Sequence, residues 1–177
     1  MLLLAADIGA TKTNLALISS DASPREPLCE QTLPSGDYRD LAGLVLDFMA
    51  YSHTRLGSRV APDRACFGVP GPVIAGSVEI TNLPWVLAED DLARDLHVEQ
   101  VTLLNDLAAT AYAIPFLTPE ELHQIKPGEP EPCGTIAVLA PGTGLGEAFL
   151  TCDGGHYQPH GSEGGHTDFS PTDIEQI

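Results

Sequence analysis

The stretch that decides the fold is LLLAADIGATKTNLAL, residues 2–17, in which two apolar runs flank a glycine turn. Leu2–Ala6 and Thr13–Ser19 have the composition of β-strands, and DIGAT at Asp7–Thr11 lies between them with no helix behind it. The stretch is therefore predicted to form a β-hairpin. Glycine allows a tight turn and lets a ligand approach the main chain closely. Successive N–H groups in such a turn form a concavity that binds anions.

A second glycine loop has the same design in the second half of the chain. PGTGLG at Pro141–Gly146 follows the apolar run Ile136–Ala140 and precedes Glu147–Cys152, which predicts a second hairpin. A dinucleotide-binding loop of the Rossmann type is a poor interpretation, because no helix follows this loop. Two such loops, in halves of different character, suggest two lobes that close on one polyphosphate.

The composition excludes several classes of partner. The 177 residues carry a formal net charge of −17 and only eight Lys and Arg, which argues against nucleic acid or an anionic membrane as a partner. Backbone amides and a metal cation can still supply the positive field that a phosphate needs. No apolar run is long enough to span a membrane, and Met1 is followed by no basic region typical of a signal peptide. A cytoplasmic location is expected.

The four cysteines (Cys29, Cys66, Cys133, Cys152) show no C-x-x-C spacing, and reduced thiols are expected.

The remaining pattern predicts an α/β fold. A composition shift near residues 112–118, followed by the proline-rich segment Pro127–Pro132, predicts one domain at residues 1–112 and another at 113–177. The other predicted elements are strands at Leu28–Leu33, Arg64–Val69 and Val101–Leu104, a small hairpin at Val73–Ile80, a turn at Asp153–Gly155, and helices at Asp37–Leu56, Glu89–Leu96 and Leu107–Phe116.

Six segments occur in an order that is specific to one family. LLLAADIGATKTNLAL, FGVPGPV, TNLPW, LLNDLAATAYAIP, IAVLAPGTGLG and GSEGGHTDFSP together resemble the bacterial glucokinase family, the ATP-dependent glucose kinases of the hexokinase/actin superfamily. The resemblance covers essentially the whole chain and implies an actin-like ATPase, RNase H-like fold. Residues 1–112 would be the small lobe, with one phosphate loop and an Asn-Asp sugar site. Residues 113–177 would be part of the large lobe, with the second phosphate loop and the EGGH sugar motif.

The Asn-Asp pair is the predicted catalytic centre. A sugar hydroxyl must be positioned, relieved of its proton and aimed in line at the γ-phosphate. Asp106 follows the apolar strand VTLLN, and open α/β sheets place their sites at such strand ends. The resemblance makes Asp106 the general base that accepts the proton of the sugar 6-hydroxyl, and makes Asn105 a ligand of sugar hydroxyls. An alternative is that the pair caps the helix at Leu107–Phe116; both roles can hold together.

Further sugar contacts are implied for the EGGH segment. By resemblance, Glu163 and His166 hydrogen-bond sugar hydroxyls, and Asn82 in TNLPW lines the sugar site unless it only caps its own turn. A metal cluster of His160, Glu163 and His166 is an alternative, although Gly161, Gly164 and Gly165 argue against a helix that would align them. A related sugar-kinase and repressor family has a Cys-rich zinc motif after this segment, and none follows His166 here, so no metal ligands are assigned.

The resemblance assigns the two glycine loops to Mg-ATP. Asp7 is placed near the Mg²⁺ carried with ATP, with an ordinary strand-end turn bond as the alternative. Ala10 stands where glycine is common, which is tolerated if its φ stays negative. Lys12 either touches a phosphate or is a solvated surface residue. The residues expected near phosphate are Gly9, Ala10, Thr11, Lys12, Gly142, Thr143 and Gly144.

Three hypotheses follow for the function. The first is a glucokinase that moves the γ-phosphate of ATP to the 6-hydroxyl of glucose, giving glucose 6-phosphate. The second is a non-catalytic sugar-binding or regulatory module of the same family. The third is a remnant that is stable only as an oligomer and binds neither ligand. Family members run to nearly twice this length, and a homodimer, common among relatives, is expected.

Overall fold

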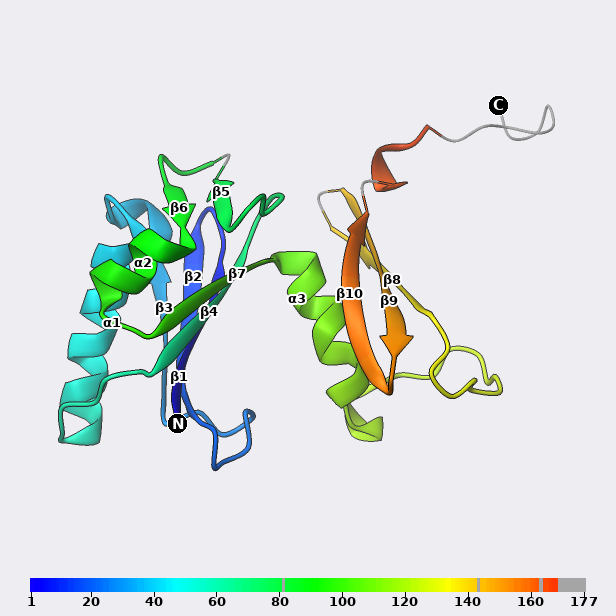
Figure 1. Ribbon diagram of the computed structural model, residues 1–177, viewed down its shortest axis with the longest axis horizontal. Helices are drawn as coiled ribbons and strands as arrows, with labels where there is room; N and C mark the ends of the chain where they lie inside the picture. Colours follow the sequence, from blue (N-terminus) through cyan, green and yellow to red (C-terminus); the bar gives the residue numbers. More distant parts are fainter. Residues whose placement is uncertain (81, 143, 163, 169–177) are drawn as a thin grey trace. The chain divides into compact units, whose positions relative to one another are not determined.

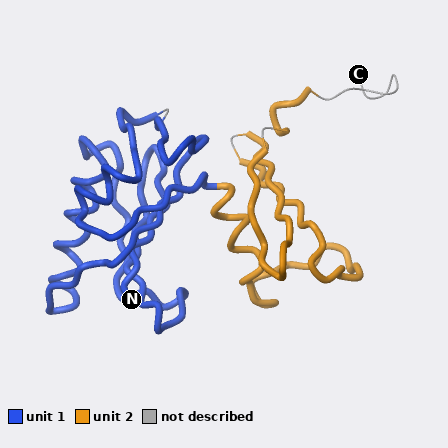
Figure 2. The backbone as a smooth tube through the Cα atoms, in the orientation of Figure 1, with its two compact units in different colours: residues 1–106 blue, residues 107–177 orange. Residues whose placement is uncertain are grey.

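The computed structural model describes residues 1–80, 82–142, 144–162 and 164–168 of the chain. Two compact units divide it, Met1–Asp106 and Leu107–Ile177 (Figure 2). The division lies between residues 106 and 107, whereas the sequence suggested 112 and 113. The difference arises because the helix at residues 106–113 packs its Ala111 into the core of the second unit. The interpretation of the units as small and large lobe stays a prediction.

Unit 1 is built, in its described residues, on a mixed five-stranded sheet of order β3-β2-β1-β4-β7. The hairpin β1–β2 and the pair β2–β3 are antiparallel, while β4 runs parallel to β1 and β7 parallel to β4 (Figure 1). This arrangement confirms the α/β order expected from the sequence. The strands are β1 (Leu2–Ile8), β2 (Lys12–Ser19), β3 (Cys29–Pro34), β4 (Arg64–Val69) and β7 (Gln100–Asn105); a small ribbon adds β5 (Ser77–Glu79) and β6 (Val86–Ala88).

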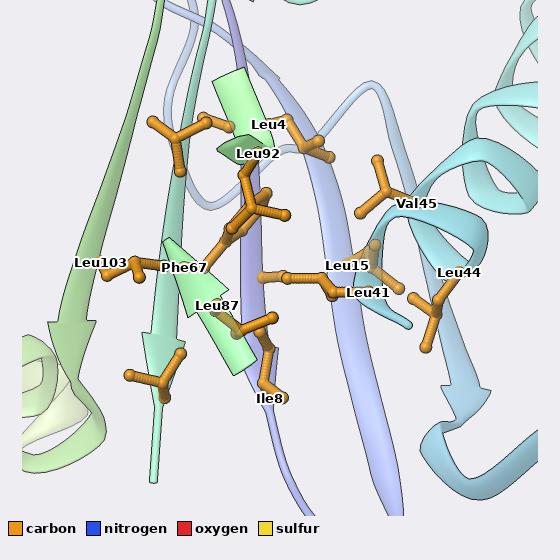
Figure 3. Packing of buried hydrophobic residues seen from close by; sticks show 14 of the residues in the cluster. Leu4, Ile8, Leu15, Leu41, Leu44, Val45, Phe67, Leu87, Leu92 and Leu103 are labelled. Atoms are coloured by element: carbon orange, nitrogen blue, oxygen red, sulfur yellow. The ribbon is translucent and has the colours of Figure 1, made fainter. Parts of the chain in front are cut away.

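One face of this sheet carries the core of unit 1. Alternate strand residues such as Leu4, Leu15 and Phe67 point to the helices α1 (Leu41–Leu56) and α2 (Glu89–Leu96), where Leu44 and Leu92 meet them (Figure 3). Because strand side chains alternate between faces, the intervening residues lie on the opposite face. That alternation puts Asp7, Asn14 and Thr32 on the opposite face.

Helix α1 begins later than the sequence suggested. Residues Ser35–Asp37 form a separate 3-10 turn, η1, and the helix starts at Leu41 after Asp40, whose Oδ1 accepts the Gly43 N–H at 2.8 Å. An aspartate in this position satisfies an N–H that the first helical turn leaves unpaired. The predicted start at Asp37 was therefore wrong, whereas the end at Gly57 is confirmed.

Two other local predictions need refinement. The predicted hairpin at residues 73–80 is present but short: Ile74 and Ser77 exchange both backbone hydrogen bonds, at 2.9 and 3.0 Å, around the turn at residues 75–76, and β5 then pairs with β6. The helix that begins at Asp106, α3 (Asp106–Ala113), ends before Pro115, which lies in the 3-10 turn η2 (Ile114–Phe116). Proline lacks the N–H that a continuing α-helix would need.

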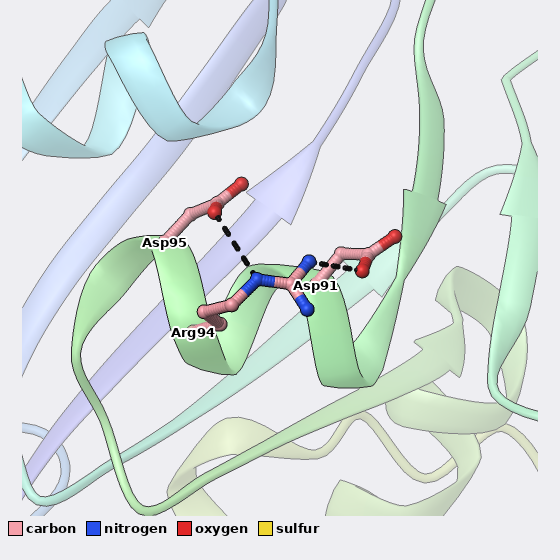
Figure 4. A network of polar contacts seen from close by, with 3 residues as sticks. All are labelled: Asp91, Arg94 and Asp95. Carbon is pink, nitrogen blue, oxygen red and sulfur yellow. Dashed lines mark hydrogen bonds and ion pairs between the residues drawn. The ribbon is translucent and has the colours of Figure 1, made fainter.

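Helix α2 fixes the strand that leads to the Asn-Asp pair. Its first residue, Glu89, accepts the N–H of Leu103 on β7 at 2.7 Å. On the exposed side, Arg94 is paired with Asp91 and lies 3.9 Å from Asp95 (Figure 4). Exposed pairs of this kind stabilise little, so the contact of Glu89 with β7 matters more for the site.

The described residues of unit 2 form a three-stranded antiparallel sheet packed on α3. Its strands are β8 (Ile136–Pro141), β9 (Leu145–Asp153) and β10 (His156–Ser162), in the order β10-β9-β8, with short 3-10 turns η3 (Pro119–Glu121) and η4 (Gly164–His166). Ala111 of α3 packs with Val138, Ala148 and Leu150. Among the described residues, no helix of either unit is long and apolar enough to cross a membrane.

The expectation of four reduced thiols was wrong for two of them. Cys133 and Cys152 form a disulfide, with their Cα atoms 5.2 Å apart, while Cys29 and Cys66 are free. The cause is the register of the second hairpin. Ile136 pairs with Leu150, so the residues that precede β8 lie beside those at the end of β9. Cys133 and Cys152 are 19 residues apart in the sequence, and that spacing alone does not indicate that they lie side by side.

Candidate active site

The Asn-Asp pair lies where β7 ends and α3 begins. Asn105 is the last residue of β7 and Asp106 the first of α3. The side-chain amide Nδ2 of Asn105 donates to Asp106 Oδ1 and to the backbone oxygen of Gly71, each at 3.1 Å. Gly71 follows β4, the parallel neighbour of β7, so the pair lies at the carboxyl ends of two parallel strands. A carboxylate in the first turn of a helix is also favoured by the helix dipole, so structural and catalytic roles are compatible.

The first glycine loop is the turn of the predicted hairpin. The Gly9 N–H donates to the Lys12 oxygen at 3.0 Å, and strand pairing begins between Ile8 and Thr13. A Cβ at residue 9 would lie 2.8 Å from the same oxygen, so the turn requires glycine there. Ala10 has no positive φ, which meets the condition for an alanine in this loop. Ala10, Thr11 and Lys12 are exposed.

Asp7 belongs to a polar row that crosses three strands. Asp7, Asn14 and Thr32 are register partners on β1, β2 and β3. Asn14 Nδ2 donates to Asp7 Oδ2 at 3.3 Å, and Thr32 Oγ1 donates to Asn14 Oδ1 at 2.8 Å. The row borders a hollow of about 680 Å³ that small residues such as Ala5 and Ala16 leave open. The exposed Asp7 carboxylate is therefore held in one orientation at the end of β1.

The second glycine loop is also a confirmed hairpin turn. Pro141 pairs with Leu145, and the Gly142 N–H donates to the Gly144 oxygen at 2.8 Å. No atom lies within 4 Å of where a Cβ of Gly144 would be, so the main chain is accessible on that side. Thr143, predicted to contact phosphate, lies outside the described residues.

The EGGH segment lies against the strand that follows the second loop. Gly164–His166 form the turn η4, and a Cβ on Gly165 would overlap the carbonyl of Leu145. Only glycine allows this approach, which brings His166 to the start of β9. Glu163 lies outside the described residues. His160 Nε2 is hydrogen-bonded to Thr151 Oγ1 at 2.8 Å, and the described residues contain no group of three side chains suited to a metal.

The TNLPW segment supplies one exposed and one buried side chain. Asn82 is exposed in the turn before β6, and its predicted contact with sugar stays a prediction. Trp85 is buried, and its Nε1–H donates to the backbone carbonyl oxygen of Tyr38 at 3.4 Å. Trp85 is thus a packing residue.

The described residues fit Mg-ATP better than a metal held by protein ligands alone. Mg²⁺ is usually bound through one or two carboxylates together with phosphate oxygens and water. Asp7 offers one such carboxylate, next to a hairpin turn with exposed Ala10 and Thr11. The predicted role of the glycine loops in holding the nucleotide's phosphates stays a prediction.

Sequence reasoning missed the polar residues that support these loops. Thr13 and Ser35 are buried and hydrogen-bonded to each other at 2.9 Å behind the first loop. Asn14 could have been found: a hairpin with so short a turn fixes its register, and that register places Asn14 opposite Asp7.

The fold is that of the actin-like ATPases, and the glycine hairpins and the strand-end Asn-Asp pair lie in it where the sequence predicted them. A family model described as glucokinase matches residues 4–177. The chain therefore belongs to the glucokinase family, and the resemblance seen in the sequence is confirmed.

Individual relatives agree with this assignment. The chain is 42% identical over 174 residues to a glucokinase of Synechocystis sp. and 39% identical over 171 residues to one of Nostoc punctiforme. The matches cover 95% and 96% of this chain and 49% of each relative, so the chain spans about half their length. A crystal structure of glucokinase from an Antarctic psychrotroph superposes with a TM-score of 0.85 at 31% identity, over 99% of this chain and 54% of that one.

Proposed function

We propose that this chain carries the catalytic base and the phosphate loops of a glucokinase, which transfers the γ-phosphate of ATP to the 6-hydroxyl of glucose and gives glucose 6-phosphate. The observation that supports this most is the Asn105–Asp106 pair, hydrogen-bonded at the end of β7 in a chain of the glucokinase family. Phosphoryl transfer depends on positioning and on charge stabilisation. The glycine hairpins would supply backbone amides to the phosphates, and the carboxylate at the end of the strand would act on the sugar hydroxyl.

Asp106 is the proposed general base. Its carboxylate accepts the proton of the sugar 6-hydroxyl as that oxygen bonds to the γ-phosphorus of ATP and ADP leaves. General bases of this kind contribute about 10²–10⁴ in rate. The hydrogen bond from Asn105 and the position at the first turn of α3 fix the direction of the carboxylate. Asn105 is itself held by the Gly71 oxygen, so its amide is oriented before a sugar arrives.

The sugar hydroxyls are the proposed ligands of Asn105, Glu163 and His166, with Asn82 as a further contact. A site built from hydrogen-bonding groups rejects analogues that lack a hydroxyl, because its own polar groups would be left unpaired. The close approach of Gly165 to Leu145 fixes the turn that carries His166.

The phosphate groups are the proposed ligands of the two glycine loops, and Asp7 is the proposed ligand of the accompanying Mg²⁺. Mg-ATP, when bound, supplies the phosphoryl group and neutralises part of its charge. Asn14 and Thr32 hold the Asp7 carboxylate in place. The net charge of −17 makes these backbone amides and the cation the main sources of positive field for a polyphosphate.

The test uses the 177-residue chain in titration calorimetry with glucose and with Mg-ATP, followed by a coupled assay for glucose 6-phosphate. We expect both ligands to bind, and the variant Asp106→Asn to lose turnover while it retains glucose binding and its melting temperature. Asp21→Asn, the same change at an exposed turn, is the control and should retain the wild-type rate. Retained turnover in Asp106→Asn would refute the assignment of the base, and failure to bind either ligand would refute the function for this chain.

The predicted cytoplasmic location and homodimer belong to the same proposal. Light scattering of the purified chain measures its mass directly. A mass of one chain across the working concentration range would contradict the homodimer.

A further inference from the structure

A pair of buried hydroxyls lies behind the first glycine loop. Thr13 and Ser35 both have 0% of their surface exposed. Their side-chain oxygens are 2.9 Å apart. Thr13 lies on β2, and Ser35 begins the turn η1 after β3, so two segments that are 22 residues apart in sequence meet at this point.

Ser35 is bonded to the loop on two sides. Its hydroxyl donates to the Gly9 oxygen at 2.6 Å, and its backbone N–H donates to the Thr11 oxygen at 3.1 Å. A serine hydroxyl has one hydrogen, and here it is used on Gly9. Thr13 must therefore donate to Ser35, which gives a directed chain from Thr13 through Ser35 to the Gly9 carbonyl.

These bonds determine the direction of an exposed amide. A trans peptide is planar, with its C=O and N–H pointing in opposite directions. Because the Gly9 carbonyl points to Ser35, the Ala10 N–H of the same peptide points away from Ser35. Ala10 is an exposed residue, and the bond of Ser35 to the Gly9 oxygen holds the Ala10 N–H in this direction before any ligand binds.

The contrast with Ser52 shows what is unusual about Ser35. Ser52 is equally buried, but its hydroxyl bonds to the Phe48 oxygen at 2.9 Å, one turn earlier in the same helix. That bond is local and connects no loop. Ser35 instead donates its hydroxyl hydrogen to the Gly9 carbonyl and its backbone N–H to the Thr11 carbonyl, one on each side of Ala10.

We infer that Ser35 is a positioning residue for the first glycine loop: it fixes the Gly9 and Thr11 carbonyls, and so directs the Ala10 amide toward a phosphate oxygen. Thr13 assists by donating to Ser35. The role of the loop in phosphate binding rests on the proposed function; the fixing of the loop by Ser35 does not.

The experiment compares Ser35→Ala with Ser52→Ala in the full 177-residue chain. Both changes remove one fully buried hydroxyl, and only the first removes a bond to the loop. Hydrogen exchange is followed by NMR at the amides of Gly9 and Ser35, each as a ratio to the amide of Phe67 in the buried strand β4, so that a general loss of stability cancels. Titration with Mg-ATP gives the dissociation constant of each variant.

We expect Ser35→Ala to raise the exchange ratios at Gly9 and Ser35 about 2- to 10-fold, the range that one hydrogen bond accounts for, and to weaken Mg-ATP binding by a similar factor. Ser52→Ala should change neither. Thr13→Val leaves both loop bonds of Ser35 in place. It should raise the exchange ratios and weaken Mg-ATP binding by smaller factors than Ser35→Ala does, and it provides the test if Ser35→Ala does not fold.

Equal exchange ratios in Ser35→Ala and Ser52→Ala, or no change in Thr13→Val where Ser35→Ala does not fold, would overturn the inference. Faster loop exchange with unchanged Mg-ATP affinity would overturn its link to phosphate. If the wild-type chain binds no Mg-ATP but its loop exchange still depends on Ser35, the phosphate part of the proposed function fails and the positioning role of Ser35 is supported.

Discussion

The side-chain amide of Asn105 donates to the carboxylate of Asp106 across 3.1 Å, and the same nitrogen donates to the backbone oxygen of Gly71 at an equal distance. Asn105 thus connects the loop after β4 to the carboxylate at the start of α3. A carboxylate held in this way needs little reorganisation before it accepts a proton, which is the condition under which a positioned base is effective.

Replacing Asn105 with alanine should therefore weaken glucose binding about 10-fold and also lower turnover. A hydrogen bond to a charged group contributes about 1.5–3 kcal/mol, and Asn105→Ala removes one such bond to Asp106. Calorimetry and the coupled assay measure the two effects. Asn82→Ala, at an exposed turn, should have the smaller effect on both. Equal effects of the two variants would contradict a special role for the pair.

The hairpins and their loops could be predicted because their signals are local. The two apolar runs on either side of Gly9 are separated by only a few residues, so they can be joined only by a tight turn. A tight turn makes the two strands pair antiparallel, as β1 and β2 do. The family, too, was accessible from the sequence, because its motifs are short and occur in a fixed order.

Features that depend on distant segments could not be predicted in this way. The disulfide of Cys133 with Cys152 depends on the register of β8 and β9, and the bonds of Ser35 depend on where β3 ends relative to the first loop. The late start of α1 has a similar cause, since Ser35 is buried against the loop and the chain must turn before the helix can begin. Propensity within a window of sequence contains none of this information.

The core of unit 1 should be sensitive to one leucine of α1 and insensitive to another. Leu44 is 0% exposed and Leu46, two residues later, is 55% exposed. Leu44→Ala removes buried methyl groups and leaves a cavity, at a cost of about 2–5 kcal/mol in the free energy of unfolding. Leu46→Ala makes the same chemical change at the surface, where effects are usually within about 0.5 kcal/mol. Urea denaturation followed by circular dichroism measures both, and similar midpoints would contradict the packing of α1 on the sheet.

A count of free thiols tests the disulfide of unit 2. Under denaturing conditions without reductant, Ellman's reagent should titrate two thiols per chain, those of Cys29 and Cys66, and four after reduction. Removing the bond in the double variant Cys133→Ser, Cys152→Ser should lower the free energy of unfolding by about 2–4 kcal/mol. The reason is that the disulfide closes a loop in the unfolded chain and so lowers the entropy of the unfolded state. Four thiols in the unreduced protein would show that the pair is reduced in solution.

Of two glycines four residues apart, only one should be sensitive to replacement by alanine. A Cβ at Gly165 would overlap the Leu145 carbonyl, which belongs to the backbone of β9 and cannot rotate away, whereas no atom lies within 4 Å of a Cβ at Gly161. Gly161 also has no positive φ, so Gly161→Ala should leave stability nearly unchanged.

Gly165→Ala should displace the turn η4 from β9, at a cost of about 1–3 kcal/mol for overpacking. Because His166 is in that turn, glucose affinity should fall in Gly165→Ala and not in Gly161→Ala. Thermal unfolding and calorimetry with glucose measure the two quantities on the same samples. A loss of stability in Gly165→Ala without a loss of glucose affinity would separate the EGGH turn from the sugar site, and would leave sugar recognition in the described residues to the Asn105–Asp106 pair and Asn82.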